Sequence, residues 1–284
     1  MRFGFHISIS HGFVESLEVA KSLGCETMQI FTGSQQQWRR SVIDEDDASE
    51  FKTRRKKKDI SPLFVHLFYL PNFATPDREL LEKSQNALIA ELDRAAMLGA
   101  EYIILHPGAY KNSTKEEGIR KVAASLDYVF GKIAGGRGDK VKVLIENTSA
   151  GGTRLGGEFE EFARIFDFLK HSYKVGVCLD TAHAFEAGYP IHTEEGLADT
   201  LEEFDRLVGL NKLHLLHLND SKSAFSSRND RHWHIGEGEI GIETFKRIIR
   251  HPRLKHIPAI METPTDFQAD LKNMKTVKAI RNGA

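Results

Sequence analysis

The sequence is short of cysteine, with two, Cys25 and Cys178, in 284 residues. Each lies beside apolar, strand-like sequence, which indicates buried thiols in a reducing compartment rather than a disulfide. Long apolar runs are also missing, since the longest patch, 62–73, is shorter than the ~20 residues of a membrane-spanning helix. The N-terminal "MRFGFHIS" has no signal-peptide core. We therefore expect a cytoplasmic protein with no membrane association.

The sequence also lacks an excess of charge of either sign. Lys and Arg number 39 against 40 Asp and Glu, which gives a net charge of -1. This balance excludes a strongly basic nucleic-acid binder, so any anionic partner has to be held by a local field. The basic run 54–58 ("RRKKK") follows an acidic run, which predicts the solvated face of a charged helix rather than a DNA-binding patch.

Short apolar runs alternate with segments whose apolar residues recur every three or four positions, a pattern typical of strands followed by helices. We predict eight strands, at residues 2–7, 27–32, 62–67, 102–107, 142–147, 175–180, 212–219 and 258–263. Continuous apolar strands separated by helices indicate a parallel sheet. Eight such units predict a single-domain (β/α)8 TIM barrel over residues 1–284. A Rossmann fold is disfavoured, because no Gly-rich dinucleotide turn follows the first strand.

Six of the predicted strands end in an ionisable residue: His66, His106, Glu146, Asp180, His217 and Glu262. In a barrel the C-terminal strand ends surround one pocket, so we expect these side chains to converge there. Three carboxylates and three imidazoles packed out of water are unfavourable without a compensating cation. The set predicts a metal centre, and imidazole mixed with carboxylate, without thiolate, suits Zn, Mn, Fe or Co.

Three more candidate ligands follow in two loops. His183 lies at the turn that leaves the sixth predicted strand. The segment 229–241, "NDRHWHIGEGEIG", holds Asp230 and His232, whose side chains point to the same side of an extended chain. Together these three residues form a candidate open metal site beside the first cluster. His234 continues the alternation, but we expect it outside the ligand set.

With these residues in place, the sequence resembles the endonuclease IV family of zinc-dependent apurinic/apyrimidinic endonucleases. The matching motifs run nearly end to end: "FHIS", "QQWR", "HLFYLPN", "LHPG", "IENT", "GVCLDTAHAFEAGY", "HLNDSKS", "DRHWHIGEGEIG" and "METP". The resemblance implies a TIM barrel with three Zn²⁺ ions at its C-terminal face. It assigns His66, His106 and Glu146 to the first ion, Glu146, Asp180, His217 and Glu262 to the second, and His183, Asp230 and His232 to the third.

The resemblance also implies the reaction. A zinc-held hydroxide attacks the phosphorus 5′ to an abasic site in double-stranded DNA, leaving a 3′-hydroxyl and a 5′-deoxyribose phosphate. Glu146, Asp180 and Glu262 are the expected catalytic carboxylates. Zinc lowers the pKa of bound water to about 7, which makes hydroxide available at neutral pH. Three Zn²⁺ ions outweigh the four ligand carboxylates, so the pocket stays cationic and can hold a phosphodiester. We expect the protein to act as a monomer.

Three residues are candidates for DNA contact. Tyr69 and Leu70 match the family positions that enter the duplex at the damage. The loop after the second predicted strand departs from the family, which often has Lys-Asn near Gly33-Ser34 and a basic residue at Gln36. Gln36 remains a DNA-binding candidate, but the departure puts the loop's intercalating and phosphate-contacting role in question.

Two other functions fit parts of the pattern. A xylose-isomerase-like sugar isomerase or epimerase would use the same barrel and a two-metal rim, but it would leave His183, Asp230 and His232 without a role. A DNA-lesion binder without turnover would fit the altered loop, but it would not need the intact ligand set. Strand cleavage of a duplex with one abasic analogue, with and without chelator, separates the three hypotheses.

Overall fold

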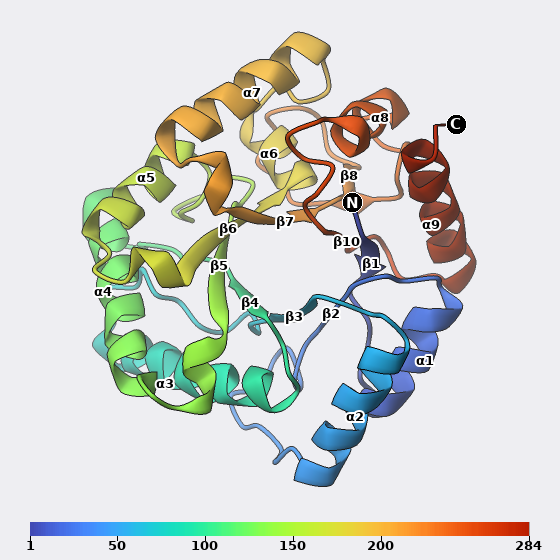
Figure 1. Ribbon diagram of the computed structural model, residues 1–284. Coiled ribbons are helices and arrows are strands. Elements are labelled where there is room, and N and C mark those ends of the chain that lie inside the picture. Colours follow the sequence, from blue (N-terminus) through green and yellow to red (C-terminus); the bar gives the residue numbers. More distant parts are fainter. Residues whose placement is uncertain (284) are drawn as a thin grey trace.

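Eight parallel strands form a barrel at the centre of the structure, a computed structural model that describes residues 1–283 (Figure 1). They are β1 (Phe3–Phe5), β2 (Met28–Ile30), β3 (Leu63–His66), β4 (Tyr102–Leu105), β5 (Lys142–Glu146), β6 (Val175–Asp180), β7 (Leu213–His217) and β10 (Ala259–Met261). Each lies inside one of the eight predicted ranges, and their order around the barrel is β1-β10-β7-β6-β5-β4-β3-β2. The (β/α)8 TIM-barrel prediction is therefore confirmed.

A ring of helices covers the outside of the barrel (Figure 1). The outer helices are α1 (Phe13–Ser22), α2 (Glu45–Lys57), α3 (Arg78–Met97), α4 (Lys115–Ile133), α5 (Phe159–Phe168), α7 (Glu194–Leu207), α8 (Ile242–Arg250) and α9 (Phe267–Arg281). A shorter helix, α6 (Thr181–Ala187), follows β6 directly. Turns of 3-10 helix at Arg137–Lys140, Ser172–Lys174 and Leu210–Lys212 precede β5, β6 and β7.

The helix α4 shows why these segments fold as they do. The hydroxyl of Thr114 accepts a hydrogen bond from the N–H of Glu117, and the Glu117 carboxylate accepts one from the N–H of Thr114. This reciprocal cap satisfies two donors that the helix leaves free. The apolar stripe is buried along its whole length: Ile119, Val122, Leu126, Phe130 and Ile133. At roughly 1.5–3 kcal/mol for each fully buried side chain, the stripe holds the helix on the barrel.

Inside the barrel, one apolar layer lies beneath the C-terminal rim. It consists of Phe64, Ile104, Leu144, Cys178, Leu215 and Ile260, one from each of six neighbouring strands. Side chains two residues apart on a strand point to the same face. The residues two positions further along these strands therefore stand directly above the layer, and they are the six ionisable residues that were predicted to converge.

A bulge in β7 brings another histidine into the barrel. The register between β6 and β7 shifts, so that Leu213 packs in the cluster shared with the helices while Leu215 packs inside. His214 turns inward, where a Cβ on Gly176 would lie 2.3 Å from its ring. Glycine at this position leaves room for the imidazole at the lower end of the barrel.

The barrel closes between β1 and β2 through one bridge rather than a ladder in the described residues. His6 pairs with Gln29 at this point, and the N–H of Ile7 donates to the Gln29 carbonyl at 2.8 Å. The other neighbouring strands pair over two or more residues. The N–H groups of Glu26 and Thr27 also donate to the Phe3 carbonyl, at 2.8 and 3.4 Å, so hydrogen bonds hold the β1–β2 seam without a regular ladder.

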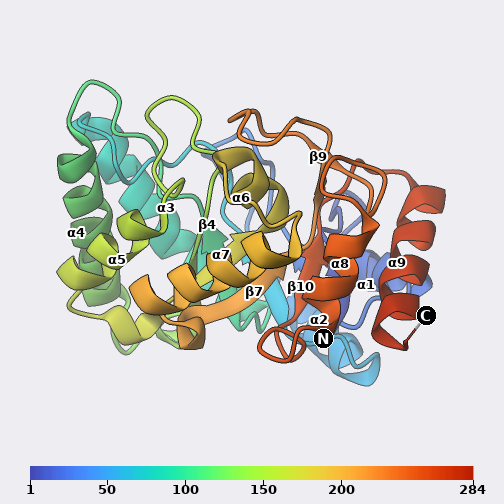
Figure 2. The ribbon, with the colours of Figure 1, turned by 90° about the horizontal axis from the view of Figure 1, so that it is seen from above.

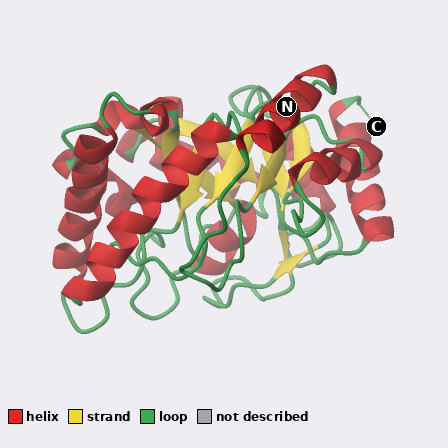
Figure 3. Cartoon of the chain, turned by 90° about the horizontal axis from the view of Figure 1, so that it is seen from below, coloured by secondary structure: helices red, strands yellow, loops and turns green. Residues whose placement is uncertain are grey.

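The loops that follow the strands gather at one end of the barrel (Figures 2 and 3). The loop after β7 adds a small antiparallel sheet there, formed by β8 (Asp220–Ser221) and β9 (His232–Trp233). The chain's N-terminus lies toward the opposite end (Figure 2). The basic run 54–58 spans the end of α2 and is largely exposed, as the charge pattern predicted.

Both cysteines are buried and free, as the sequence predicted. Burial raises the pKa of each thiol to about 12, so both remain protonated and unreactive. No helix within residues 1–283 combines the length and apolar character that a membrane crossing demands.

Candidate metal centre

The strand-end residues and the loop ligands form three groups of possible metal donors above the apolar layer. The first holds His66, His106 and Glu146, the second Glu146, Asp180, His217 and Glu262, and the third Asp180, His183 and His232. Within each group one donor atom from every residue lies within 4.8 Å of the others. The structure thus brings together eight of the nine predicted ligands in these groups, and Asp230 lies at the edge of the third.

Glu146 is the centre of the arrangement. Its Oε2 lies 3.1 Å from His66 Nε2 and 3.5 Å from His106 Nε2, and its Oε1 lies 2.9 Å from His217 Nδ1. The side chain is 1% exposed. Burial alone would raise the pKa of Glu146, but the imidazoles of His217 and His106 hold it well below its ordinary value. The carboxylate is therefore ionised and faces two donor groups at once.

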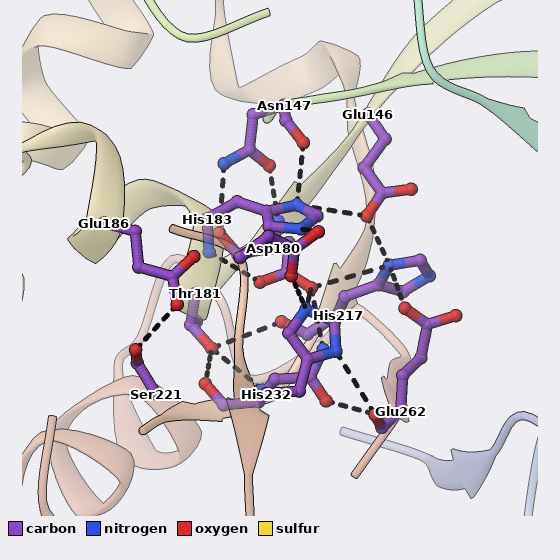
Figure 4. Close-up of polar contacts among 12 residues, drawn as sticks. Glu146, Asn147, Asp180, Thr181, His183, Glu186, His217, Ser221, His232 and Glu262 are labelled. Atoms are coloured by element: carbon purple, nitrogen blue, oxygen red, sulfur yellow. Dashed lines mark hydrogen bonds and ion pairs between the residues drawn. The ribbon is translucent and has the colours of Figure 1, made fainter. Parts of the chain in front are cut away.

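The third group lies where α6 begins (Figure 4). The N–H of His183 donates to Asp180 Oδ1 at 2.9 Å, which caps the helix and holds the two ligands together. His183 Nε2 lies 3.2 Å from Asp230 Oδ2, and His232 Nε2 lies 3.4 Å from Asp180 Oδ2 and 3.5 Å from Asp230 Oδ1. Asp230 is 46% exposed, so this group opens toward solvent.

Backbone and amide oxygens orient four of the imidazoles. His66 Nδ1–H donates to Leu67 O, and His183 Nδ1–H donates to Asn147 O. His232 Nδ1–H donates to Glu262 O, and His217 Nε2–H donates to Gln29 Oε1. In each ring the other nitrogen is left facing the carboxylates. His232 Nε2 is buried and finds no hydrogen-bond donor among residues 1–283. This is the arrangement of metal-binding histidines, in which a hydrogen bond on one nitrogen fixes a lone pair on the other.

The field in the pocket also favours a cation. Burial would lower the pKa of His183, but Asp180 and Asp230 outweigh it and raise the pKa well above the ordinary value. The carboxylates around His183 therefore favour positive charge at its Nε2, the atom that would bind a metal ion. The donor set of imidazoles and carboxylates, with one shared carboxylate, fits several zinc ions in one pocket.

Two residues that sequence reasoning missed link the ligands to the β1–β2 seam. Gln29 Nε2 donates to Glu262 Oε1 at 2.6 Å, and its Oε1 accepts from His217 at 2.8 Å. His6 Nδ1 lies 2.8 Å from the same amide nitrogen and 3.3 Å from Glu262 Oε1. The available signal was a lone Gln within the apolar run "TMQIFT" and another His at a strand end.

Two asparagines just beyond strand ends, Asn219 and Asn147, play a similar part, and Figure 4 shows Asn147 beside Asp180. Asn219 donates to Asp180 Oδ2 at 2.7 Å and accepts from the N–H of Glu262 at 2.7 Å. Asn147 Oδ1 accepts from the N–H of Asp180 at 2.6 Å. These bonds hold neighbouring strand ends together, and they fix the positions of the ligands on them.

Glu186 of α6 anchors the loop that carries Asp230 and His232. Its carboxylate is fully buried and accepts hydrogen bonds from the Ser221 hydroxyl at 2.7 Å and from the N–H of Arg231 at 3.0 Å. Because Arg231 stands between the two ligands, this contact holds the loop over the third group. His234, by contrast, hydrogen-bonds Asn273 and belongs to none of the three groups, as expected.

The predicted DNA-contact residues lie at two separate cavities on the rim. Tyr69 is 60% exposed, and with Leu70 it lines a cavity of about 460 Å³ that also holds His106 and His183. Gln36 lines a second cavity of about 600 Å³. Tyr69 and Gln36 are both exposed at the mouth of the barrel, and the Tyr69 ring lies 5.7 Å from Phe31, which lines the second cavity.

The chain is similar to known proteins over its whole length. A family model described as "Xylose isomerase-like TIM barrel" matches residues 17–281. The chain is 41% identical to the "Probable endonuclease 4" of Chloroflexus aurantiacus, over 100% of this chain and 99% of the relative. It is 38% identical to the protein of the same name from Halothermothrix orenii, over 99% of each.

Solved structures are similar over the same length. The crystal structure of endonuclease IV from Thermus thermophilus superposes with a TM-score of 0.87 at 36% identity and covers 100% of both chains. A D-tagatose 3-epimerase-like protein gives a TM-score of 0.72 at 18% identity, covering 99% of this chain and 97% of that one. At that identity the second similarity concerns the fold alone.

Proposed function

The chain belongs to the endonuclease IV family of apurinic/apyrimidinic endonucleases of DNA repair, and from this premise we propose that it cleaves the phosphodiester 5′ to abasic sites in double-stranded DNA. The products are a 3′-hydroxyl and a 5′-deoxyribose phosphate. Three zinc ions are proposed as the cofactor, held by the nine residues assigned above. Action in the cytoplasm as a monomer is part of the proposal, and the two buried free thiols accord with a reducing compartment.

The observation that carries the proposal is the third donor group. A two-metal sugar isomerase needs Glu146, Asp180, His217 and Glu262, but it has no use for further ligands at the start of α6 and in the loop before β9. Here His183 lies 3.2 Å from Asp230 Oδ2, and His232 lies 3.5 Å from Asp230 Oδ1. A third donor group beside the shared Glu146 carboxylate has a role in the proposed three-zinc centre and none in a two-metal sugar isomerase.

Bound zinc would supply positive charge for the phosphodiester and activate water at neutral pH. The protein's own contribution is orientation. Glu146 faces two groups of imidazoles at once, and Gln29 holds Glu262 and His217 in fixed positions. Such preorganised groups need no rearrangement when charge develops in the transition state.

In this proposal, residues at the C-terminal rim of the barrel select damaged DNA. A nucleotide without a base stacks poorly, so its displacement from the duplex costs less than that of an intact nucleotide. Tyr69 and Leu70 stand at the mouth of the metal pocket, where they can occupy the space left in the duplex. Partial burial of the phenol oxygen and the nearby Glu262 and Glu146 carboxylates raise the pKa of Tyr69, so the ring stays uncharged beside anionic DNA.

The test is cleavage of a duplex that carries one tetrahydrofuran abasic analogue. We expect one break on its 5′ side, loss of cleavage after chelation, and recovery when Zn²⁺ is returned. An otherwise identical duplex without the analogue is the control and should stay intact. Absence of a break from protein with full metal loading would overturn the proposal, and epimerisation of a ketohexose by the same sample would support the sugar-isomerase hypothesis.

A further inference from the structure

Two basic side chains line the same 460 Å³ cavity as some of the metal-ligand candidates. Its lining includes Tyr69, His106 and Asp230 together with Lys111 and Arg154, which come from the loops that follow β4 and β5. Both basic residues are exposed. This places two cations on the surface that a DNA strand must approach to reach the metal centre.

The backbone beneath the two cations is held in place. The loops after β4 and β5 are joined by an antiparallel bridge between Ala109 and Arg154, and the N–H of Tyr110 donates to the Thr153 carbonyl at 3.0 Å. The N–H of Lys111 donates to the Thr153 hydroxyl at 3.2 Å. Lys111 has φ 53°, a left-handed conformation that is uncommon for a residue with a side chain and that these contacts maintain.

Neither cation is engaged within the protein. Lys111 and Arg154 have no carboxylate partner anywhere in residues 1–283, whereas the nearby Lys115 contacts Glu158 at 3.0 Å. Two unpaired cations on a fixed wall, beside a metal pocket, are suited to a phosphate diester. Arginine offers a planar pair of donors for phosphate oxygens, and lysine adds a point charge.

The other cavity on the rim provides the contrast. The 600 Å³ cavity is lined by His6, Ser8, Ser10, Gln35 and Gln36, among others, and none of its lining residues in the described chain is a Lys, Arg, Asp or Glu. The nearby Arg40 does not compensate, because its Nε lies 2.8 Å from Glu91 Oε1 and its guanidinium stacks 3.7 Å from the Phe68 ring. The first cavity therefore has two basic side chains among its lining residues, and the second has none.

We propose that Lys111 and Arg154 together bind one backbone phosphate that flanks the scissile linkage, and that this contact replaces one expected from the loop after β2. The inference rests on the proposed function, because it takes damaged duplex DNA as the ligand. Contacts of this kind position the duplex without reading its sequence.

The experiment measures binding of a tetrahydrofuran-containing duplex and of the matching intact duplex over a range of KCl concentrations. For Lys111→Ala/Arg154→Ala we expect the slope of log Ka against log [KCl] to become shallower by about 0.9, the value for one phosphate contact. Affinity should fall about tenfold at physiological salt on both duplexes, and the kinetic loss should appear in KM. Zinc content should match that of the wild type.

Lys56→Ala/Lys57→Ala is the matched control. It removes the same charge from exposed positions of α2 at the far end of the barrel, so its salt slope should equal that of the wild type. Lys111→Gln/Arg154→Gln tests the same point with longer side chains and should reproduce the shallower slope. Equal slopes for the wild type and both rim variants would overturn the inference.

The two proposals fail in different ways. Wild-type cleavage of the abasic duplex together with unchanged slopes in the rim variants would overturn the phosphate contact alone. Absence of wild-type cleavage from fully loaded protein would overturn the nuclease function, and with it the inference. A shallower slope together with lost zinc would also count against the inference, since it would indicate damage to the metal centre.

Discussion

The neighbouring ends of strands β5 and β7 place a histidine of β7 beside a charged residue of β5 at both ends of the barrel. The charged residue is a lysine at the lower end and a glutamate at the rim. At the lower end, Lys142 Nζ lies 3.3 Å from His214 Nε2. At the rim, where the same two strands end, Glu146 Oε1 lies 2.9 Å from His217 Nδ1. One pair of strands thus presents an imidazole to a cation at one end and to a carboxylate at the other.

The pKa values of the two histidines follow the sign of their neighbours. Burial lowers the pKa of His214 to about 4, and Lys142 and Lys212 act in the same direction. Burial also acts to lower the pKa of His217, but the carboxylates of Glu146 and Glu262 are among the groups that outweigh it and raise the pKa. Burial of a histidine in the barrel therefore does not by itself produce a candidate metal site, whereas the carboxylates beside the histidines at the rim do.

The largest effect should come from Glu146→Gln, which removes the charge shared by two donor groups. We expect strand cleavage to fall by about a thousandfold or more, since a bound metal contributes several kcal/mol and about 1.36 kcal/mol is a factor of ten. Elemental analysis should show fewer than two zinc ions per chain. Lys142→Met, at the other end of the same strand, is the control and should keep its metal. Full zinc content in Glu146→Gln would show that the rim carboxylate is no more important for metal binding than Lys142 at the lower end.

His183→Ala should have the next largest effect. It removes one ligand of the third group, so we expect that ion and most turnover to be lost while the fold survives. Elemental analysis and the thermal melting of the metal-free protein check the two halves of this expectation. An unchanged ratio of zinc to protein would contradict the assignment of His183.

Gln29→Leu should act more weakly, because it removes hydrogen bonds to ligands rather than a ligand. Loss of the contacts to Glu262 and His217 should lower zinc affinity by about 10- to 100-fold, as is usual for such supporting groups. Competition with a chromogenic chelator measures the affinity. Wild-type affinity would show that the two ligands hold their positions without the amide.

The smallest effect should come from His214→Gln, at the lower end. The pKa of His214 in the folded protein, about 4, lies below the ordinary value of 6.5. Between these values the unfolded chain binds more protons, so the wild type loses stability as the pH falls from about 6.5 to 4. The variant should show a shallower loss in urea unfolding of metal-free protein, with unchanged zinc content in the holoenzyme. If the free energy of unfolding of both proteins changed equally with pH, the assigned role of His214 would be wrong.

Sequence reasoning reached the strands and their ligands because both follow from a period of two. An apolar residue that points into the barrel places the residue two positions later on the same face, as with Leu144 and Glu146. The rule placed His217 correctly on β7 but does not predict that the bulge turns His214 inward, because a register shift depends on the neighbouring strand. The partners of each ligand were equally hidden, since His6 and Gln29 meet Glu262 only when the barrel closes.

The sequence also predicted the division of the ligands among the three groups only in part. The resemblance assigned Asp230 to His183 and His232, and the structure keeps it within 3.5 Å of both. Asp180, assigned to the second group, also stands close to His232, at 3.4 Å. The sequence pattern identifies candidate donors. It does not show that the Asp180 carboxylate both caps α6 and belongs to the candidate metal centre.

The bridge between His6 and Gln29 links the closure of the barrel to the positions of the metal-ligand candidates. The two residues that fasten the first strand to the second also touch Glu262, and Gln29 reaches His217 as well. Glu262 and His217 gain these hydrogen bonds only when the first and second strands meet. Formation of the candidate metal centre is therefore coupled to closure of the barrel.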